Sequence, residues 1–511
     1  MNVPETAPAP EIPDVDLATF TLERADEFGD RAALIDGPTG RTISFSEFRG
    51  LVESLAGALA ARGIGRGDVV AIYMPNLPEY AVIFHGVLRA NATNTTANPL
   101  YTESELGHQL SDSGAKLVFT VGPFLETARK AAEHAGIDDI VVVGEAEGDE
   151  PTLASLLGEG AAPPEIDIDP ATDLAALPYS SGTTGLPKGV MLTHRNLVAN
   201  VLQTNTVFEM GTDDVLIGVL PFFHIYGQTV IMNLGLRNGA AVVTMPRFDL
   251  DQFLSLIEEH KVTLANVVPP IALALAKHPA VEGTDLSSLR VIMSGAAPLG
   301  AELSDAVTAR LGVPTIQGYG MTETSPVTHV SPIEPDRIKP GTIGLPVPGT
   351  ETRVVDPETR EDGTRGELLI RGPQVMAGYL NNEDATKHTI DEDGWLHTGD
   401  VAEVDEDGYF AIVDRLKELI KYKGFQVPPA ELEAILITHP AIADCAVIGV
   451  PDEEAGELPK AFVVCSGEVT DDEILEFVAA KVSPQKKVRI LERIEEIPKS
   501  ASGKILRRQL K

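Results

Sequence analysis

Short apolar runs alternate with helix-like stretches through much of the chain, and this alternation limits the possible folds more than any other feature. Residues 69–74 form one such run, Pro75 and Asn76 close it, and residues 78–89 have the pattern of a helix. Similar runs recur at residues 117–121, 140–143, 241–245 and 291–293. Strands separated by helices predict α/β sheets with crossover connections.

The pattern changes near residue 340. From there to Asp414, short β-like runs alternate with turns, and residues 401–404 and 409–413 predict a hairpin. After Asp414 the chain becomes charged and then restarts as an α+β unit in which Pro428 and Pro429 begin a helix. We therefore predict an α/β protein with three parts: a large N-terminal body of stacked α/β sheets, a β-rich subdomain within it, and a small mobile α+β C-terminal domain. The predicted boundaries are 16–414 and 415–511, with a hinge near 415–417.

The charge balance excludes some classes of partner. Lys and Arg total 40 against 76 Asp and Glu, so the net charge is −36. Nucleic-acid binding and docking on an anionic membrane both need clustered cations, so neither is expected. The simplest interpretation is a solvated, self-repelling surface.

The ends of the chain and its cysteines predict a cytoplasmic protein. Residues 1–15 lack the basic and apolar regions of a signal peptide and are expected to form a disordered lead. No apolar run reaches about 18 residues, so no spanning helix is expected. Cys445 and Cys465 are too few for a disulfide framework and are predicted to be small core residues.

Residues 179–189 are the strongest local signal. Four Ser and Thr hydroxyls, three glycines and Lys188 lie in one short loop. Glycines permit close backbone approach, hydroxyl and N–H groups can bind phosphate oxygens, and the lysine adds charge. The spacing does not match a Walker A loop. Composition alone leaves a phosphate-binding loop and a surface turn equally open.

Tyr319 lies between two glycines in the second motif, residues 317–323. Its ring can stack on a purine. Thr322 can bind a phosphate, and the carboxylate of Glu323 can hold Mg²⁺, which prefers oxygen ligands. A tyrosine in a glycine turn is also a common structural feature, so that alternative stays open.

Three further residues have both a functional and a structural interpretation. Asp400 follows a glycine turn, where a carboxylate can accept two hydrogen bonds from a ribose diol or can act as a cap. Trp395, the only tryptophan, is predicted to anchor a core. His224 lies among aromatic residues, which favours a core histidine with satisfied hydrogen bonds.

Two basic segments stand out in so acidic a chain. Residues 414–426 contain Arg415, Lys417, Lys421 and Lys423, which indicate either an anionic ligand or a paired, solvated helix face. Residues 498–508, which include Lys504, have the composition of a solvated basic tail.

In this order and at these separations, the motifs together resemble the adenylate-forming superfamily of acyl-CoA synthetases, firefly luciferase and peptide-synthetase adenylation domains. The resemblance spans residue 15 to Lys511. Residues 223–226, 294–299 and 421–427 are most similar to 4-coumarate:CoA ligases and bacterial cinnamate:CoA ligases. Medium-chain acyl-CoA synthetases share much of this pattern.

The resemblance implies that ATP, Mg²⁺ and coenzyme A act with a small carboxylic acid in two steps. Adenylation comes first, with Lys504 bridging the carboxylate and the α-phosphate and Glu323 holding Mg²⁺. Lys417 occupies the hinge position. The residues that match the nucleotide-binding motifs are Ser180, Ser181, Gly182, Thr183, Thr184, Gly185, Lys188, Gln317, Gly318, Tyr319, Gly320, Thr322, Asp400 and Arg415.

Thioester formation follows after the small domain turns about its hinge. The resemblance assigns Lys421 and Gln426 to this step, Lys423 and Gly424 to the pantetheine tunnel, and His224 to an aromatic gate. Thr328 stands where the plant enzymes usually have an apolar residue. The residues that match the acyl pocket are Tyr226, Val230, Ala296, Gly320, Pro326, Val327 and Thr328.

The sequence therefore favours an ATP-dependent carboxylic acid:CoA ligase acting on 4-coumarate or cinnamate-type acids. A medium- or long-chain fatty acyl-CoA synthetase is the main alternative, because Gly295 and Ala296 leave room for an alkyl chain as well as a ring. A stand-alone adenylation domain that loads a carrier protein, a luciferase-like oxygenase and a non-catalytic nucleotide-binding protein are less favoured. The oligomeric state is left open.

Overall fold

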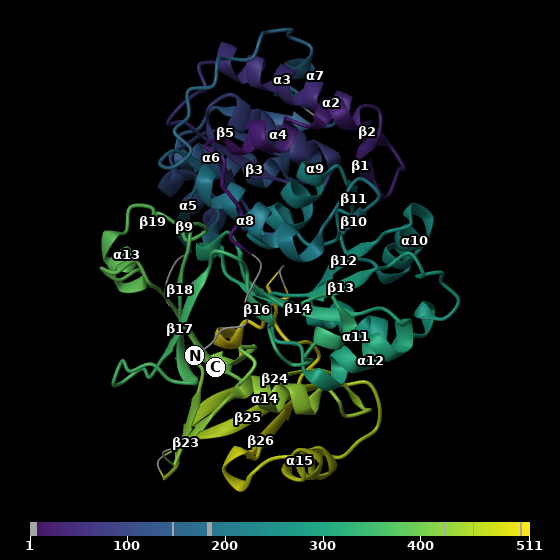
Figure 1. Ribbon diagram of the computed structural model, residues 1–511, viewed down its shortest axis with the longest axis vertical. Coiled ribbons are helices and arrows are strands. Elements are labelled where there is room, and N and C mark those ends of the chain that lie inside the picture. Colours follow the sequence, from purple (N-terminus) through teal and green to yellow (C-terminus); the bar gives the residue numbers. More distant parts are fainter. Residues whose placement is uncertain (1–7, 146–147, 181–186, 424, 453, 501–502) are drawn as a thin grey trace.

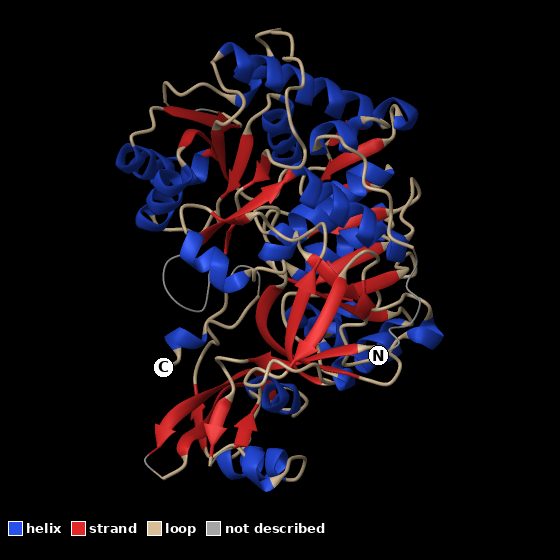
Figure 2. Ribbon diagram, turned by 60° about the vertical axis from the view of Figure 1, so that its left-hand side comes forward, coloured by secondary structure: helices blue, strands red, loops and turns tan. Residues whose placement is uncertain are grey.

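Most of the chain before residue 340 forms two large sheets and their helices, whereas most of the chain after it forms a smaller sheet and a C-terminal body (Figure 1). This computed structural model describes residues 8–145, 148–180, 187–423, 425–452, 454–500 and 503–511. Within these ranges the strands form four sheets. Two large sheets and their helices make the upper body, a smaller antiparallel sheet lies beside it, and the C-terminal strands form a separate lower body (Figures 1 and 2). The predicted α/β class with a small C-terminal domain is confirmed.

The first large sheet is mainly parallel and is built from the predicted strand–helix alternation. Its order is β19-β9-β7-β4-β3-β5-β6, and β8 pairs with β9. Strands β4, β3, β5 and β6 are parallel neighbours, whereas β9 runs antiparallel to β7, β8 and β19. The strands are β3 (Val69–Tyr73), β4 (Thr93–Thr96), β5 (Ala115–Val121), β6 (Asp139–Val143), β7 (Leu174–Ala176), β8 (Tyr179–Ser180), β9 (Lys188–Thr193) and β19 (Gly378–Tyr379).

The second large sheet has a parallel centre and antiparallel edges. Its order is β16-β15-β14-β13-β12-β10-β11-β1-β2. Strands β14, β13, β12, β10, β11 and β1 are parallel neighbours, so their carboxyl ends meet at one edge. The strands are β1 (Ala32–Asp36), β2 (Thr42–Ser44), β10 (Val215–Gly218), β11 (Ala241–Thr244), β12 (Leu264–Val267), β13 (Val291–Ser294), β14 (Thr315–Gly320), β15 (Val327–Val330) and β16 (Leu345–Pro346).

Helices cover these sheets, and several begin with a side-chain cap. Ser44 and Thr102 each form a capping box, at the starts of α3 and α5. The predicted helix at residues 78–89 is α4, and Pro78 occupies its first turn. The helices of this part are α1 (Leu17–Leu22), α2 (Ala25–Phe28), α3 (Phe45–Ala61), α4 (Pro78–Arg89), α5 (Glu103–Ser113), α6 (Leu125–Ala135), α7 (Leu153–Leu157), α8 (His194–Phe208), α9 (Leu234–Asn238), α10 (Leu250–His260), α11 (Pro269–Lys277) and α12 (Ala301–Leu311).

Short helical turns connect the longer elements. One of them, η2, is a π-helix that follows the aromatic segment around His224. The turns are η1 (Gly122–Phe124), η2 (Gly227–Asn233), η3 (Pro279–Val281), η4 (Thr322–Thr324), η5 (Pro335–Arg337), η6 (Pro484–Lys486) and η7 (Arg507–Gln509).

A hydrophobic core runs between the two large sheets and their helices. Most of α4 is buried, and the apolar strands of both sheets contribute side chains. Ile12 and Val15, which the sequence assigns to a disordered lead, are partly buried against this core. Residues 1–7 of that lead lie outside the described residues.

The smaller antiparallel sheet contains the predicted hairpin. Its order is β17-β18-β20-β21, and α13 (Glu383–Thr389) precedes β20. Trp395 is buried as predicted and packs with Val355 and Leu369, while the Arg371 guanidinium lies 4.4 Å from its ring centroid. The strands are β17 (Glu351–Val355), β18 (Arg365–Arg371), β20 (Leu396–Val404) and β21 (Phe410–Arg415).

The C-terminal body has its own sheet and core. Residues 420–427 form a strand pair and not the charged helix face that was one alternative from the sequence. Cys445 is buried in this core, as predicted, and Cys465 packs at its margin. The elements are β22 (Ile420–Tyr422), β23 (Phe425–Val427), α14 (Pro429–Leu436), β24 (Ile442–Asp452), β25 (Gly456–Cys465), α15 (Asp471–Ala479) and β26 (Ile490–Arg493).

Across the described ranges, none of the helices combines the length and the apolar character that crossing a bilayer requires.

Candidate active site

The hydroxyl-rich loop joins two short paired strands. Tyr179 pairs with Gly189 and Ser180 pairs with Lys188, so β8 and β9 hold the two ends of the loop together. The Lys188 ammonium lies 4.4 Å from the centroid of the Tyr379 ring. Five of the predicted phosphate-binding residues lie outside the described residues; they are Ser181, Gly182, Thr183, Thr184 and Gly185.

Glu323 lies at the end of this loop and is held by two hydroxyl groups. Ser180 Oγ donates to Glu323 Oε1 at 2.9 Å, and the Tyr379 hydroxyl donates to the same oxygen at 2.8 Å. Glu323 is buried, and its backbone carbonyl accepts the Met376 N–H. These contacts bring together β8, η4 and β19, which are far apart in the sequence.

Tyr379 is a site residue that the sequence interpretation missed. It lies on β19 beside Gly378, and burial together with the nearby Glu323 carboxylate raises the pKa of its hydroxyl, which therefore stays protonated. A tyrosine after a glycine is a common pair, so only the fold shows that this tyrosine contacts Glu323.

Asp400 and Arg415 face each other across two strands. They are register partners in the β20–β21 pair, and Arg415 Nε lies 3.4 Å from Asp400 Oδ1. The Tyr319 hydroxyl donates to Asp400 Oδ2 at 2.6 Å. Burial raises the pKa of Asp400, while Arg415, Tyr319 and Lys504 each act in the opposite direction. Tyr319 of the second motif and Asp400 therefore belong to one cluster.

The remaining residues of the second motif hold β14 in place. Gln317 Oε1 accepts the Leu299 N–H at 2.8 Å, and Gln317 Nε2 donates to the Thr342 carbonyl at 3.2 Å. Gly318 is closely packed, because a Cβ there would lie 2.3 Å from Met293 Cε. Thr322 begins η4, which carries Glu323.

Lys504 reaches this cluster from the C-terminal body. Residues 498–500 and 503–506 lie against each other. The Leu506 N–H donates to the Pro498 carbonyl, and the Lys504 N–H donates to Ser500 Oγ. Gly503 has φ +80° and meets the upper body, since a Cβ there would lie 3.2 Å from Val268 Cγ2. The predicted solvated tail is therefore wrong for Lys504, which is inserted between the two bodies.

The charges around Lys504 identify its neighbours. Burial lowers the pKa of Lys504 to about 8, and Arg415 acts in the same direction, while Asp400, Glu418 and Glu323 oppose it. Burial, with a contribution from Lys504, lowers the pKa of His224 to about 4, so that its ring is neutral near pH 7. The structure thus brings together the lysine, the carboxylates of Glu323 and Asp400, and His224.

Several of the predicted acyl-pocket residues contact one another. The Tyr226 ring packs directly on Gly295, because a Cβ at Gly295 would lie 2.7 Å from Tyr226 Cε1. Its hydroxyl lies 3.3 Å from the Met293 carbonyl, to which it donates. Gly320 packs more closely still, since a Cβ there would lie 2.0 Å from the Pro326 carbonyl oxygen.

The other predicted pocket residues surround these contacts. Val230 is buried on η2, and Val327 is buried at the start of β15, with its N–H on Asn200 Oδ1. Ala296 is exposed and has φ +68°. Thr328 is fully buried, and its hydroxyl donates to the Tyr319 carbonyl at 3.3 Å, which satisfies this polar group inside the protein.

The structure does not bring Lys421 and Gln426 to this cluster. They are register partners at the exposed β22–β23 hairpin, at the lower end of the molecule (Figure 1). Lys423 lies at the same hairpin and pairs with Glu454 at 2.9 Å, while Gly424 lies outside the described residues. Lys417 is exposed in the turn between β21 and β22.

A family model described as AMP-binding enzyme matches residues 22–380 of this chain, and one described as AMP-binding enzyme C-terminal domain matches residues 431–504. The chain is 47% identical to 4-coumarate–CoA ligase 5 of Oryza sativa subsp. japonica over 98% of its own length and 95% of that protein. It is 46% identical to 4-coumarate–CoA ligase 2 of Petroselinum crispum, over 97% and 93%.

Solved structures agree with this similarity over nearly the full chain. The anthranilate CoA ligase AuaEII in complex with anthranoyl-AMP has a TM-score of 0.91 and 27% identity, covering 97% of this chain and 96% of that one. ATP-bound MatB from Rhodopseudomonas palustris has a TM-score of 0.88 and 30% identity, covering 98% of each chain.

Proposed function

The chain belongs to the AMP-binding enzyme family, and from that premise we propose that it is an ATP-dependent carboxylic acid:CoA ligase acting on acids of the 4-coumarate type. The relatives of nearly equal length are 4-coumarate–CoA ligases. The reaction has two steps, in which an acyl-adenylate forms first and the thiol of coenzyme A then displaces AMP.

The position of Lys504 is the observation that carries this proposal. Its ammonium lies in the electrostatic field of Asp400, Arg415 and Glu323, and it also acts on His224. A lysine beside Asp400 and His224 is suited to the place where the acid meets the α-phosphate of ATP. A carboxylate and a triphosphate repel each other, and a fixed cation between them removes that barrier.

In the first step, the chain holds ATP and the acid in line. Asp400 accepts the ribose hydroxyls, with Arg415 beside it, and the Tyr319 ring lies against the purine. Lys504 contacts the acid and the α-phosphate, so the carboxylate oxygen attacks phosphorus and pyrophosphate leaves. The pyrophosphate is held by the hydroxyl-rich loop between β8 and β9 and by Lys188.

Glu323 is suited to Mg²⁺ by its chemistry. Its buried carboxylate offers oxygen ligands to a metal ion. The hydroxyls of Ser180 and Tyr379 orient it by donating hydrogen bonds to Oε1. A single protein carboxylate is typical for Mg²⁺ in nucleotide sites, because phosphates and water supply the other ligands. When bound, the ion neutralises charge on the triphosphate. We also place the reaction in the cytoplasm, in keeping with the two free cysteines.

In the second step, the small domain turns about the segment near 415–417. Lys504 leaves the cluster, and the β22–β23 hairpin with Lys421 and Gln426 takes its place. Lys423 and Gly424 then line the path of pantetheine. The thiolate attacks the acyl carbonyl, the carbon–oxygen bond to phosphate breaks, and AMP leaves.

Two glycines of this region pack directly on their neighbours. Gly295 and Gly320 pack against Tyr226 and Pro326 with no room for a side chain of their own. The Thr328 hydroxyl is bonded to the backbone, so that a polar residue here does not require a polar substrate. The aromatic acid is supported by the relatives, which are 4-coumarate–CoA ligases.

The test is AMP release that depends on ATP, Mg²⁺ and coenzyme A, over cinnamate, 4-coumarate, benzoate, octanoate and palmitate. Turnover with the two cinnamates, and none with the Lys504→Ala variant, is the expected result. Turnover with alkyl acids alone would reject the aromatic assignment in favour of a fatty acyl-CoA synthetase. Pyrophosphate release without a CoA thioester would reject CoA as the acceptor in favour of a carrier protein.

A further inference from the structure

Strand β20 bulges at the point where it presents Asp400. In the β18–β20 pair, Glu367 faces Val401 and Leu369 faces His397. Residues 398–400 of β20 therefore face Leu368 alone. Extra residues in one strand bend it and redirect a side chain. Gly399, in the middle of the bulge, has φ +69°, a conformation that favours glycine.

Two side chains hold this bulge in shape. The Thr398 hydroxyl donates to the Leu368 carbonyl at 2.7 Å and accepts the Asp400 N–H at 3.0 Å. The Gly399 N–H donates to Glu367 Oε1 at 3.2 Å. The backbone N–H groups of Gly399 and Asp400 are thus held by Glu367 across the sheet and by Thr398 within β20.

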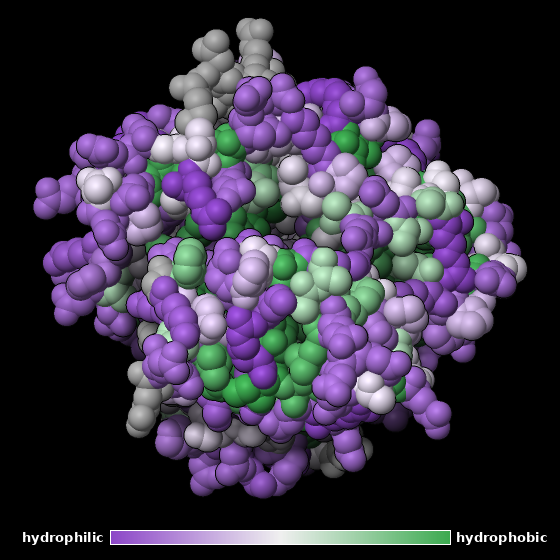
Figure 3. All heavy atoms as spheres, turned by 90° about the horizontal axis from the view of Figure 1, so that it is seen from below, coloured by the Kyte–Doolittle hydropathy of each residue, from purple (hydrophilic) through white to green (hydrophobic). Residues whose placement is uncertain are grey.

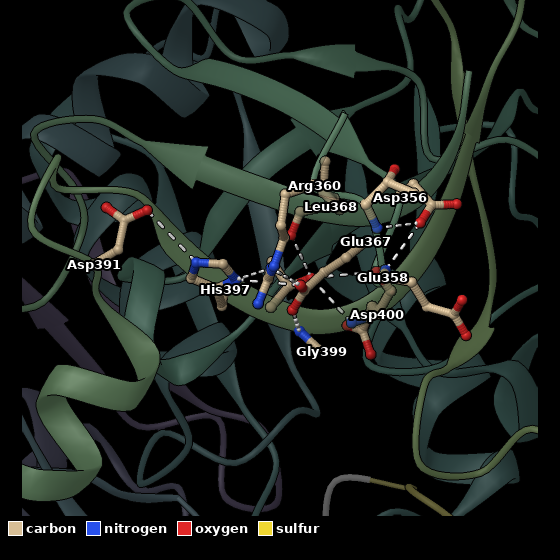
Figure 4. Close-up of polar contacts among 11 residues, drawn as sticks. Asp356, Glu358, Arg360, Glu367, Leu368, Asp391, His397, Gly399 and Asp400 are labelled. Carbon is tan, nitrogen blue, oxygen red and sulfur yellow. Dashed lines mark hydrogen bonds and ion pairs between the residues drawn. The ribbon is translucent and has the colours of Figure 1, made fainter. Parts of the chain in front are cut away.

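The two oxygens of Glu367 have different partners. Oε2 contacts Arg360 Nη1 at 3.2 Å and His397 Nδ1 at 3.1 Å. Oε1 accepts the hydrogen bond from the Gly399 N–H. His397 Nε2 lies 3.5 Å from Asp391 Oδ2, so Arg360, Glu367, His397 and Asp391 form a chain of charged and polar groups beside the bulge (Figure 4). Glu367 is only 7% exposed, and a buried carboxylate needs such partners.

We propose that Glu367 is a positioning residue for nucleotide binding, which fixes the β20 bulge through Gly399 so that Asp400 faces the ribose hydroxyls. Arg360 and His397 hold Oε2 and thereby aim Oε1 at the Gly399 N–H. This rests on the proposed ribose contact of Asp400. Glu367 itself does not touch the nucleotide.

Two variants test whether the length or the charge of the Glu367 side chain matters. Glu367→Asp keeps the charge but shortens the side chain, so that Oε1 no longer reaches Gly399. Glu367→Gln keeps the reach and an oxygen acceptor but loses the charge. Glu358→Ala is the matched control, since this nearby glutamate is exposed. The readout is the ratio of adenylation kcat/KM for ATP to that for 2′-deoxy-ATP and 3′-deoxy-ATP, with unfolding temperatures measured in parallel.

Glu367→Asp is expected to lower the preference for ATP about 10-fold, mainly through the KM for ATP, because a charge-assisted hydrogen bond of Asp400 to the ribose weakens. Glu367→Gln and Glu358→Ala are expected to stay within about 3-fold of wild type. A general loss of stability would lower all rates together without changing this ratio. An unchanged ratio in a folded Glu367→Asp protein would overturn the proposal.

Thr398→Val provides a second route if Glu367→Asp does not fold. It removes the other side-chain contact of the bulge, so that the ATP preference is expected to fall again; an unchanged ratio would count against the proposal. Asp400→Ala tests the ribose contact of Asp400 separately from the role of Glu367. If Asp400→Ala keeps the full ATP preference, the ribose contact itself is wrong. If Asp400→Ala loses the preference while Glu367→Asp retains it, only the role of Glu367 is wrong.

Discussion

At the residue scale, burial and neighbouring charges both act on Lys504. Burial and Arg415 both lower its pKa, to about 8, despite the opposing carboxylates of Asp400, Glu418 and Glu323. Lys504 is therefore charged below about pH 8 in the enzyme without substrates. With its ordinary pKa of 10.5, the ammonium would stay charged to a correspondingly higher pH.

The pH dependence of adenylation follows from this value. As the pH rises through about 8, Lys504 loses the charge that neutralises the acid and the α-phosphate, so kcat/KM for ATP–pyrophosphate exchange is expected to fall. In Lys504→Arg the guanidinium stays charged, and the reduced activity is expected to lack this alkaline decline. Rate profiles from about pH 7 to 10 measure the difference. The same alkaline decline in both proteins would assign it to another group.

His224 contributes a neutral ring to the same region. Its pKa is lowered to about 4 by burial and by Lys504, so it carries no charge at the pH where the enzyme works. We expect a neutral ring here to act as a gate and not as a proton donor. His224 Nδ1 also accepts the Tyr226 N–H at 3.3 Å, which links this ring to a residue of the proposed acyl pocket.

At the element scale, we expect two segments of the small domain to serve different steps of the reaction. The turn with Lys504 reaches the nucleotide cluster, whereas the β22–β23 hairpin with Lys421 and Gln426 is exposed. Phe425 in that hairpin is 54% exposed. We expect this exposed hairpin to meet the large body in a second domain orientation.

Separate half-reactions test this division between the two segments. Lys504→Ala is expected to lower acyl-adenylate formation by about 100-fold or more while sparing the transfer of a pre-formed acyl-adenylate to coenzyme A. Lys421→Ala is expected to show the reverse order. Stopped-time assays of pyrophosphate release and of thioester formation measure the two steps. Equal losses in both steps for either variant would contradict the division.

Arg507 ties the Lys504 turn to the rest of the small domain. It forms a bidentate pair with Glu433 on α14, and its Nε lies 2.8 Å from Glu418 Oε2, one residue after Lys417. The Arg507 and Glu433 side chains are 14% and 13% exposed, so that removing Arg507 takes the arginine partner from a nearly buried carboxylate. These pairs join the turn, the helix and the hinge segment.

Arg507→Met is expected to slow adenylation about 10-fold or more and to leave thioester formation from a pre-formed adenylate within about 3-fold. The reason is that Lys504 loses its anchor, whereas the β22–β23 hairpin does not depend on it. Arg508→Met is the control, because the neighbouring arginine is exposed. The same half-reaction assays apply, and an equal effect of both substitutions would show that the buried pairs have no special role.

At the scale of the whole molecule, the net charge of −36 acts on the folded state. One face of the molecule, viewed from below, is covered mainly by hydrophilic residues, with apolar residues in a few patches between them (Figure 3). Like charges spread over such a surface repel one another more in the compact state than in the extended chain. Ion pairs such as Arg365–Glu403 offset only part of this, because exposed pairs contribute little.

Salt is therefore expected to stabilise the protein. Raising NaCl from about 10 mM to about 500 mM shortens the screening length several-fold, which weakens the repulsion, and Tm is expected to rise by a few degrees. Differential scanning calorimetry measures the change, and an isosmolar sucrose series controls for effects other than screening. A Tm that falls with added salt would show that attractive pairs dominate over the net charge.

Local patterns determined much of this protein from the sequence alone. The apolar run and the proline signal predicted β3 and α4, and the turn residues predicted the β20–β21 hairpin, because periodicity and caps act over a few neighbouring residues. The same local chemistry identified Asp400, Tyr319 and Glu323 as candidates. The order of the motifs then led to the family.

Only the tertiary structure decided which of these residues meet. Glu323 accepts hydrogen bonds from Ser180 and Tyr379, and Asp400 accepts one from Tyr319. These contacts join residues 56 to 143 positions apart, and no local pattern specifies them. The basic tail shows the same dependence. Its composition alone indicates a solvated tail and the resemblance assigns Lys504 to adenylation, whereas its insertion depends on how the two bodies pack. Composition determines which groups are available, whereas burial and proximity, which set their pKa values and partners, exist only once distant segments have packed together.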